Sequence, residues 1–154
     1  MCQAAPVKKS DAISLSAALL AAAASLVEDI HTGTVNRGFD DLRPTHGFVF
    51  SRLSARGATV TEIAEHLGFT RQAASQIVDE LERKGYVQRH PHPDDARARL
   101  VLLTPRGRRC TEAAESAARE AVEPWEEILG ERRLLALRDE LIRLAPTGPI
   151  RPSW

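Results

Sequence analysis

Residues 59–104 read TVTEIAEHLGFTRQAASQIVDELERKGYVQRHPHPDDARARLVLLT, and this stretch decides the fold. Thr59 is followed three residues later by Glu62, which is the spacing of a capping box at the start of a helix. Gly68 stands where a left-handed residue ends a helix, and Thr70 can cap a second helix after a tight turn. Two short helices joined by a turn around one glycine predict a helix-turn-helix. The expected inward-facing residues are Ile63, Ala64 and Leu67, then Ala74, Ile77 or Val78, and Leu81.

The first turns of the second helix carry side chains that suit the reading of DNA bases. Arginine donates bidentately to guanine, glutamine pairs with adenine, and a small alanine can touch a thymine methyl group. The N-terminal end of a recognition helix is the part that meets base edges in the major groove. An ordinary solvated helix face is the alternative reading. The DNA-contacting residues expected here are Thr70, Arg71, Gln72, Ala73, Ser75 and Gln76.

A β-hairpin is predicted directly after the second helix. The short β-prone runs at residues 86–87 and 100–103 flank the turn sequence at residues 91–95. The hairpin tip is expected to hold Arg97 and Arg99, and an arginine on a thin tip can enter the narrow minor groove. Asp95 is expected to orient Arg97 by an ion pair. A helix-turn-helix followed by such a hairpin is a winged helix, although a hairpin with arginines for solubility remains the plainer alternative.

The distribution of charge supports a DNA-binding unit even though the chain is neutral. The 154 residues contain 21 Lys and Arg and 21 Asp and Glu, a formal net charge of +0. Residues 70–109 nevertheless hold nine basic and five acidic side chains, a local charge of +4, whereas residues 110–154 sum to −3. A basic patch that coincides with the helix-wing unit is the expected footprint for phosphates.

Several other classes of protein are disfavoured by the composition. With 43% hydrophobic residues the chain can form a core, so wholesale disorder is excluded. Two cysteines, Cys2 and Cys110, are too few for a disulfide framework, and a reducing, cytoplasmic location is expected. No Ser-His-Asp order, phosphate loop or metal-ligand spacing stands out, so we expect no enzyme, no cofactor and no metal.

The N-terminal apolar run, residues 12–27, is interpreted as a helix and not as a secretory signal or a membrane span. It is shorter than the roughly 20 residues that a span needs, and its apolar residues recur at steps of three or four. Ser10 or Asp11 is expected to cap this helix, and residues 31–43 are expected to form a connection. The expected stripe is Ile13, Ala17, Leu20, Ala24, Val27 and Ile30.

The remaining elements are helical. Pro44 opens a short helix over residues 45–54, and Thr104 with Pro105 opens a long one, which Pro124 is expected to kink or split. A last helix is predicted over residues 131–145. The expected organisation is a flexible tail (1–10), an N-terminal dimerisation helix with its connection (11–43), a winged helix-turn-helix (44–104), C-terminal dimerisation helices (105–145) and a flexible tail (146–154). The terminal helices carry apolar faces that a small domain cannot cover alone, which predicts a mostly α winged-helix homodimer.

Over about residues 11–145 the chain resembles the MarR family of bacterial transcriptional regulators. The resemblance is carried by three motifs: TEIA with LG at residues 61–68, the run VDELERKGYV at residues 78–87, and the wing pattern DAR at residues 95–97 that leads to LLTP at residues 102–105. It implies a dimer held by terminal helices, recognition by the helix that begins at Thr70, and a wing arginine that matches Arg97. Typical members repress transcription and leave DNA when a small aromatic or phenolic ligand binds or a cysteine is oxidised. His92 and Gln76 depart from common family residues, so base preference does not carry over.

The aromatic residues and Cys110 raise two further expectations, an effector site and a redox switch. A pocket between the dimer helices and the winged helix is expected to draw on Phe39, His46, Phe48, Phe50 and Trp125, although such aromatic residues are more often core. Cys110 follows three arginines, which would lower its pKa, but a buried inert cysteine is the commoner case. The alternatives to a ligand-responsive DNA-binding repressor are a thiol-based redox regulator and a winged-helix module that binds only proteins.

Overall fold

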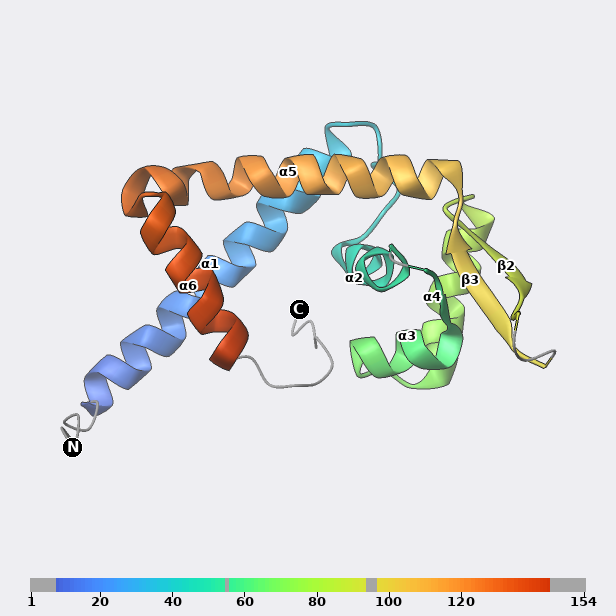
Figure 1. The fold of residues 1–154 in the computed structure, drawn as a ribbon, viewed down its shortest axis with the longest axis horizontal. Coiled ribbons are helices and arrows are strands. Elements are labelled where there is room, and N and C mark those ends of the chain that lie inside the picture. Colours follow the sequence, from blue (N-terminus) through green and yellow to red (C-terminus); the bar gives the residue numbers. More distant parts are fainter. Residues whose placement is uncertain (1–7, 55, 94–96, 145–154) are drawn as a thin grey trace.

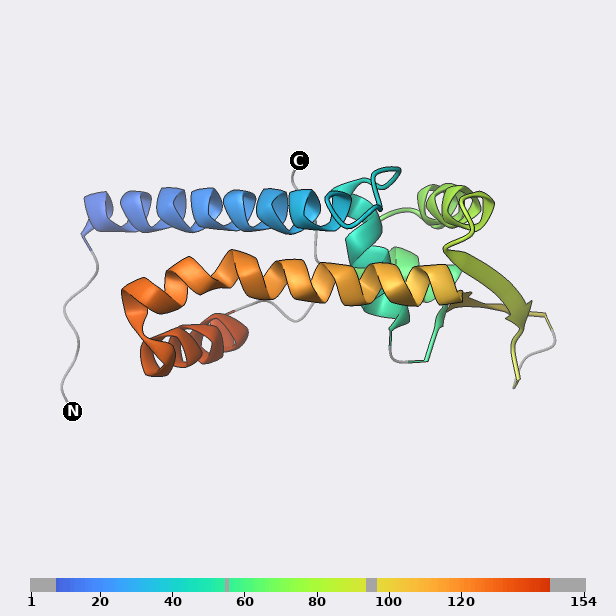
Figure 2. The same cartoon turned by 90° about the horizontal axis from the view of Figure 1, so that it is seen from above.

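The computed structural model describes residues 8–54, 56–93 and 97–144, and it shows a winged helix at one end of three longer helices (Figure 1). Helices α1 and α5 run away from the winged helix, and α6 turns back from the far end of α5 (Figure 2). The structure is mostly helical with one small sheet, which is the fold class that the sequence predicts. The elements in chain order are α1 (Lys9–Val35), α2 (Pro44–Leu53), β1 (Ala58–Thr59), α3 (Val60–Leu67), α4 (Arg71–Arg83), β2 (Val87–Pro91), β3 (Arg99–Leu103), α5 (Pro105–Leu129) and α6 (Glu131–Leu144).

The helix-turn-helix forms as its capping residues predict. The Thr59 hydroxyl accepts a hydrogen bond from the backbone N–H of Glu62 at 3.2 Å, and the Glu62 carboxylate accepts one from the N–H of Thr59 at 2.8 Å. Gly68 ends α3 in the left-handed region at φ 65°, and the Thr70 hydroxyl caps α4 by accepting from the N–H of Ala73. Satisfying these otherwise unpaired N–H groups stabilises each helix start and sets the tight turn between the helices.

Three strands form an antiparallel sheet in the order β1-β3-β2, with Arg89 opposite Val101. The two-residue strand β1, which precedes α3, was not predicted, because two residues are too few to show a periodic pattern. Pro91 is tolerated because β2 is an edge strand. Two residues of the predicted hairpin lie elsewhere. Tyr86 comes before β2 and is a buried core residue. Arg99 lies within β3, opposite Pro91, and not at the hairpin tip.

A single apolar core holds the winged helix together. Helix α4 contributes the inward stripe of Ala74, Val78 and Leu81, so Val78 and not Ile77 is the fully buried member of the predicted pair. Gly107 of α5 lies so close to the winged helix that an added Cβ would be 2.2 Å from the carbonyl oxygen of Tyr86. The other members of the core are Leu42, Val49, Phe50, Leu53, Ala58, Ile63, Ala64, Leu67, Tyr86, Val87, Val101, Leu103 and Cys110.

Helix α1 differs from its sequence-based expectation at both ends. It begins at Lys9 with Lys8 as N-cap and no side-chain capping bond, so neither Ser10 nor Asp11 caps it. It also continues through His31 to Val35, which leaves only residues 36–43 as the connection. Its 27 residues are long and apolar enough to cross a membrane by length and composition, which removes the length argument against a span. In the structure its C-terminal part packs on α5, with Gly33 against Ala117.

Helix α5 runs unbroken from Pro105 to Leu129, so of the two outcomes expected at Pro124, a kink or a split, the split does not occur. Pro124 is exposed, and water can therefore solvate the carbonyl group that loses its helical hydrogen bond. Gly130, with φ 73°, ends α5 and allows the chain to turn into α6. Helix α6 has no buried residue in this single chain.

Candidate nucleic-acid interface

The N-terminal half of α4 points its polar side chains outward because the opposite stripe is anchored in the core. Arg71, Gln72 and Gln76 are exposed, whereas Ala73 and Ser75 are half-buried. Thr70 serves as the N-cap and is itself exposed. The six residues predicted to contact DNA therefore share the first turns of one helix. That arrangement is the geometry a recognition helix requires.

A hollow of about 530 Å³ lies between the start of α3, the first turns of α4 and the wing. It brings together four guanidinium side chains from three separate segments: Arg71, Arg89, Arg97 and Arg99. Several cationic side chains around one concave surface create a positive potential that attracts phosphate. The remaining lining residues are Thr59, Val60, Thr61, Ser75 and Ala98.

The wing is only partly described. The N–H of His92 donates to the carbonyl of Ala98 at 3.1 Å, which closes the hairpin beyond the last strand pair. Arg97 and Arg99 are both exposed on the hollow. Asp95 lies outside the described residues, so the expected ion pair between Asp95 and Arg97 stays a prediction.

Arg89 was not singled out in the sequence, yet it joins the wing to α4. Its guanidinium donates to Asp79 at 2.6 Å and also to Glu82, and its backbone N–H donates to Glu82 at 3.2 Å. The sequence signal available was its place on the strand that follows the second helix, but the two carboxylates that it meets lie seven and ten residues away. These contacts hold strand β2 against α4.

A second hollow, of about 260 Å³, lies between the C-terminal part of α1, the start of α2 and α5. Of the five residues predicted for an effector pocket, Phe48 and Phe50 line it. Its walls are almost wholly apolar, and the polar or charged side chains on it include His31, Arg43 and Cys110. The full lining is Val27, Ile30, His31, Thr34, Leu42, Arg43, Pro44, Gly47, Phe48, Phe50, Ser51, Cys110 and Ala114.

The other three predicted pocket residues lie elsewhere. Phe39 packs on the ring of Tyr86 with centroids 6.3 Å apart, and His46 is completely buried in a polar cluster. Trp125 lies far along α5, in an apolar hollow shared with α1 and α6. Sequence spacing did not separate the site of Trp125 from the hollow, because one helix, α5, carries both Ala114 of the hollow and Trp125 near its far end.

The environment of Cys110 favours the inert reading of this residue. Its thiol is buried, and burial raises the pKa of Cys110 to about 11, with Asp41 adding to the rise and Arg106 opposing it. The thiolate, which is the reactive form, is therefore scarce at neutral pH. The expectation that neighbouring arginines would lower this pKa is not met, because desolvation outweighs them.

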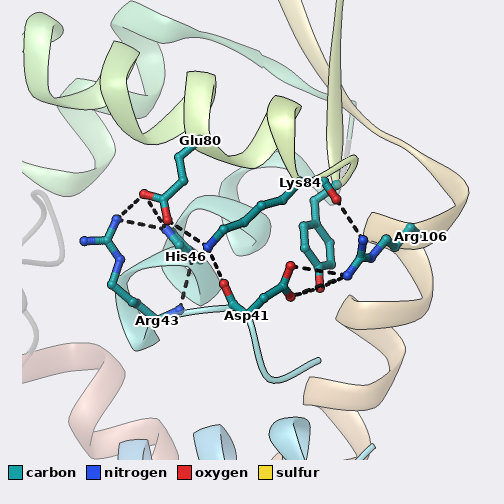
Figure 3. A network of polar contacts seen from close by, with 7 residues as sticks. Asp41, Arg43, His46, Glu80, Lys84 and Arg106 are labelled. Atoms are coloured by element: carbon teal, nitrogen blue, oxygen red, sulfur yellow. Dashed lines mark hydrogen bonds and ion pairs between the residues drawn. The ribbon is translucent and has the colours of Figure 1, made fainter. Parts of the chain in front are cut away.

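A polar cluster joins the connection before α2 to α4 and α5 (Figure 3). Glu80 accepts hydrogen bonds from Lys84 at 2.8 Å and from Arg43, and Lys84 also donates to the carbonyl of Asp41. The hydrogen bond from Lys84 holds the pKa of Glu80 below its ordinary value. Within the described residues, these contacts tie the C-terminal end of α4 to residues 41–43.

His46, Tyr86 and Arg106 complete this cluster. The Nδ1 atom of His46 accepts from the N–H of Arg43 at 3.1 Å, and burial lowers the pKa of His46 to about 4, so its ring is neutral. Tyr86 donates its hydroxyl to Asp41 at 2.5 Å, and Arg106 donates to the Tyr86 oxygen at 3.0 Å while lying over its ring. Burial raises the pKa of the Tyr86 phenol far above its ordinary value. Each member is thus fixed by at least one partner from another segment.

Solved structures share this architecture. A probable transcriptional regulator from Pseudomonas aeruginosa is 28% identical, with a TM-score of 0.64 over 87% of this chain and 96% of that one. The transcriptional repressor CouR, solved bound to a 23-mer DNA duplex, is also 28% identical, with a TM-score of 0.72 over 92% of this chain and all of that one. An uncharacterised protein of Mycobacterium tuberculosis is 30% identical over 96 residues, which cover 62% of this chain and 67% of that protein.

The fold, the outward recognition helix and the arginine-lined hollow define a winged helix-turn-helix transcriptional regulator, which is a class of DNA-binding proteins and not of enzymes. The model of the MarR family matches residues 40–98, which hold the entire helix-turn-helix and the wing up to the residue before β3. This chain belongs to the MarR family.

Proposed function

We propose that this protein is a homodimeric, sequence-specific transcriptional repressor with residues 44–104 as its DNA-binding unit. The observation that carries the proposal is the arginine-lined hollow beside the exposed first turns of α4. Arg71, Gln72, Ala73, Ser75 and Gln76 read bases in the major groove, and Thr70 positions them. Arg97 and Arg99 approach the adjacent minor groove, while Arg89, paired with Asp79 and Glu82, fixes β2 against α4.

The terminal helices form the dimer interface in this proposal. Residues 11–43 and 105–145 contain every large apolar side chain that the described chain leaves exposed: Ile13, Leu15, Leu19, Leu20, Ile128, Leu135, Leu137, Ile142 and Leu144. A second copy that covers them relates two recognition helices by a two-fold axis. The operator is therefore a pseudo-palindrome with half-sites about one helical turn, roughly 10 bp, apart. A protein of this kind works in the cytoplasm.

The apolar hollow beside Phe48 and Phe50 is the proposed site of a small aromatic or phenolic effector. Its volume of about 260 Å³ suits a single-ring molecule, and its apolar walls favour an aromatic face over a polar one. The hollow lies between the long helices and the winged helix, so a ligand there contacts both halves of the molecule. Binding at this position lowers the affinity for DNA in the proposed mechanism.

Selection from a random duplex pool followed by gel-shift titration tests the DNA-binding proposal. Arg71→Ala and Gln76→Ala are expected to relax base preference, whereas Arg97→Ala weakens binding more evenly across sequences. Arg132→Ala, an exposed arginine on α6, is the matched control and leaves the selected sequence unchanged. An absence of sequence preference together with an affinity indifferent to salt contradicts the proposal.

A filled pocket tests the effector site. Ala114→Leu places extra volume in the hollow from α5, and we expect it to abolish any effect of benzoate or phenol on DNA binding. Ala118→Leu, one turn further along α5, is the control for the added side chain and retains the effect. Equal responses in the two variants contradict the assignment of this hollow as the effector site.

A further inference from the structure

Arg106, in the first turn of α5, contacts three other segments of the chain (Figure 3). Its guanidinium donates to the carbonyl of Lys84, the C-cap of α4, at 2.9 Å and to the hydroxyl of Tyr86 at 3.0 Å. It also donates to the carboxylate of Asp41, in the connection between α1 and α2, at 3.3 Å. One side chain therefore joins α5 to the winged helix and to the segment that follows α1.

The groups that Arg106 meets are themselves fixed in place. The ring of Tyr86 is completely buried, packs on Phe50 with centroids 5.7 Å apart, and donates its hydroxyl to Asp41 at 2.5 Å. The guanidinium carbon of Arg106 lies 4.3 Å from the centre of the same ring, so a cation–π contact adds to the hydrogen bonds. An exposed ion pair alone contributes little, but a planar guanidinium held by a ring, a hydroxyl and a backbone carbonyl keeps one orientation.

The place of this contact at the start of a long helix gives it leverage on the geometry of the dimer. Helix α5 has 25 residues and runs from Arg106 to Trp125 and the apolar side chains of α6, in the proposed dimer interface. A helix of that length measures roughly 37 Å, so a rotation of about 10° at one end displaces the other end by about 6 Å. Neighbouring base pairs are about 3.4 Å apart, so such a displacement corresponds to about two base pairs.

We propose that Arg106 is a positioning residue: it fixes the angle between α5 and the winged helix and thereby sets the spacing of the two half-sites that the dimer reads. This inference rests on the proposed function and adds what determines the spacing of the operator. A rigid junction binds the matching spacing tightly, because little freedom is lost on binding, and it penalises other spacings. A loosened junction adapts to several spacings and binds the matching one less tightly. Base recognition within one half-site does not depend on Arg106.

A series of duplexes separates spacing from base recognition. Each duplex holds two copies of the selected half-site, with the spacer matching, or lengthened or shortened by one or two base pairs; a further duplex holds a single half-site. For Arg106→Gln we expect the ratio of affinities between matching and altered spacers to fall on the order of fivefold, the scale of one hydrogen bond. Its preference for the single half-site over a scrambled sequence should equal that of the wild type.

Arg109→Gln is the matched control. It removes one positive charge from an exposed residue in the first turns of the same helix. A lost charge weakens binding to every spacing alike, because attraction to phosphate does not depend on sequence. The ratio between matching and altered spacers should therefore stay at its wild-type value.

Two further variants test the arrangement of the contact. Arg106→Lys keeps the charge but lacks the planar fork that spans the carbonyl of Lys84 and the hydroxyl of Tyr86, so it should lose most of the discrimination between spacers. Tyr86→Phe keeps the buried ring and removes only the hydroxyl, and it should show a smaller loss in the same direction.

The angle itself is measured on DNA-free protein by pulsed electron spin resonance. Nitroxide labels are attached to cysteines introduced at two exposed residues, Glu65 of α3 and Glu115 of α5. Cys2 is replaced by serine, Cys110 is buried and stays, and the labelled chain is diluted into unlabelled protein so that only the distance within one chain is observed. We expect this distance distribution to broaden or shift in Arg106→Gln, and to keep its wild-type form in the control variant.

Three results overturn the inference. They are a wild-type distance distribution in Arg106→Gln, a wild-type ratio between spacers in that variant, or an equal loss of affinity for the single half-site and for every spacer, which a merely structural role predicts. The DNA-binding proposal fails on a different result, the absence of any preferred duplex. In that case the distance measurement still decides whether Arg106 fixes the angle between α5 and the winged helix.

Discussion

The winged helix buries its large apolar side chains within one chain, whereas the terminal helices leave many of theirs exposed. In the winged helix Ile63, Leu67, Val78 and Leu81 are completely buried within one chain. In α6 no residue is buried, and the N-terminal half of α1 exposes its leucines and isoleucine. The winged helix therefore has a core of its own, whereas the terminal helices present an apolar surface that a second copy can cover.

This difference separates what stabilises the protein from what assembles it. Substitutions in the winged helix should act on the unfolding of each chain. Substitutions on the terminal helices should act on association, and hence depend on protein concentration. Four experiments probe that division.

The largest effect on the free energy of unfolding is expected for a buried residue of α4. Leu81→Ala removes a fully buried side chain and should lower the free energy of unfolding by about 2–5 kcal/mol. Urea denaturation at several protein concentrations should give the same loss each time. Leu135→Ala, at a residue 43% exposed on α6, is the contrasting variant, and its cost should change with protein concentration. If both variants lose the same free energy of unfolding at every protein concentration, the proposed difference between the two regions is wrong.

The buried histidine adds a pH dependence to the winged helix. The pKa of His46 is about 4 in the folded protein against an ordinary value of 6.5, so the unfolded chain binds the extra proton between these values. Stability is therefore complete above about pH 6.5 and falls as the pH drops toward 4, by about 3 kcal/mol in total. Urea denaturation of wild type and His46→Gln across this range isolates the contribution, because the variant should lack that part of the slope. Identical slopes would refute it.

An acidic substitution on α6 should act mainly on assembly. Ile142→Asp places a charge on a side chain that is 67% exposed in one chain, so unfolding of the single chain should change by about 0.5 kcal/mol or less. Sedimentation should show loss of the dimer, and affinity for a two-half-site duplex should fall with it. Arg132→Ala on the same helix should remain dimeric. A dimer that persists in Ile142→Asp places the interface elsewhere.

The smallest effect concerns Gly47 of α2, which lines the apolar hollow beside Phe48 and Phe50. An added Cβ at Gly47 meets nothing within 4 Å, and alanine is the better helix former. Gly47→Ala should raise the free energy of unfolding by about 0.5–1 kcal/mol, measured as a shift in the urea midpoint. A lower midpoint would mean that this helix needs the glycine for close packing against another copy.

Much of the winged helix was predictable from the sequence, because the residues that start and end its helices act on their near neighbours. The capping residues Thr59 and Thr70 and the glycine at residue 68 act within a few positions, and the structure confirms all three. The ends of α1 were not predictable in this way. Polar residues at 31–35 suggest a loop, but packing of the helix on α5 through Gly33 and Ala117 carries it through them.

The residues predicted for an effector pocket also show where sequence reasoning stops. Phe39, His46 and Trp125 share aromatic character with Phe48 and Phe50, yet only the last two reach the hollow. The role of Arg89 was likewise hidden, since the carboxylates of Asp79 and Glu82 meet it only after the hairpin folds back on α4.

The sequence by itself determined the helix-turn-helix, the polar first turns of α4 and the basic character of the helix-wing unit within a neutral chain. Capping, periodicity and local charge are properties of neighbouring residues, so they can be read before the chain folds. Only the tertiary structure decided that Arg43, before α2, meets Glu80 of α4, and that four arginines from three segments line one hollow. Such convergence depends on how distant segments pack, and no local pattern encodes that packing.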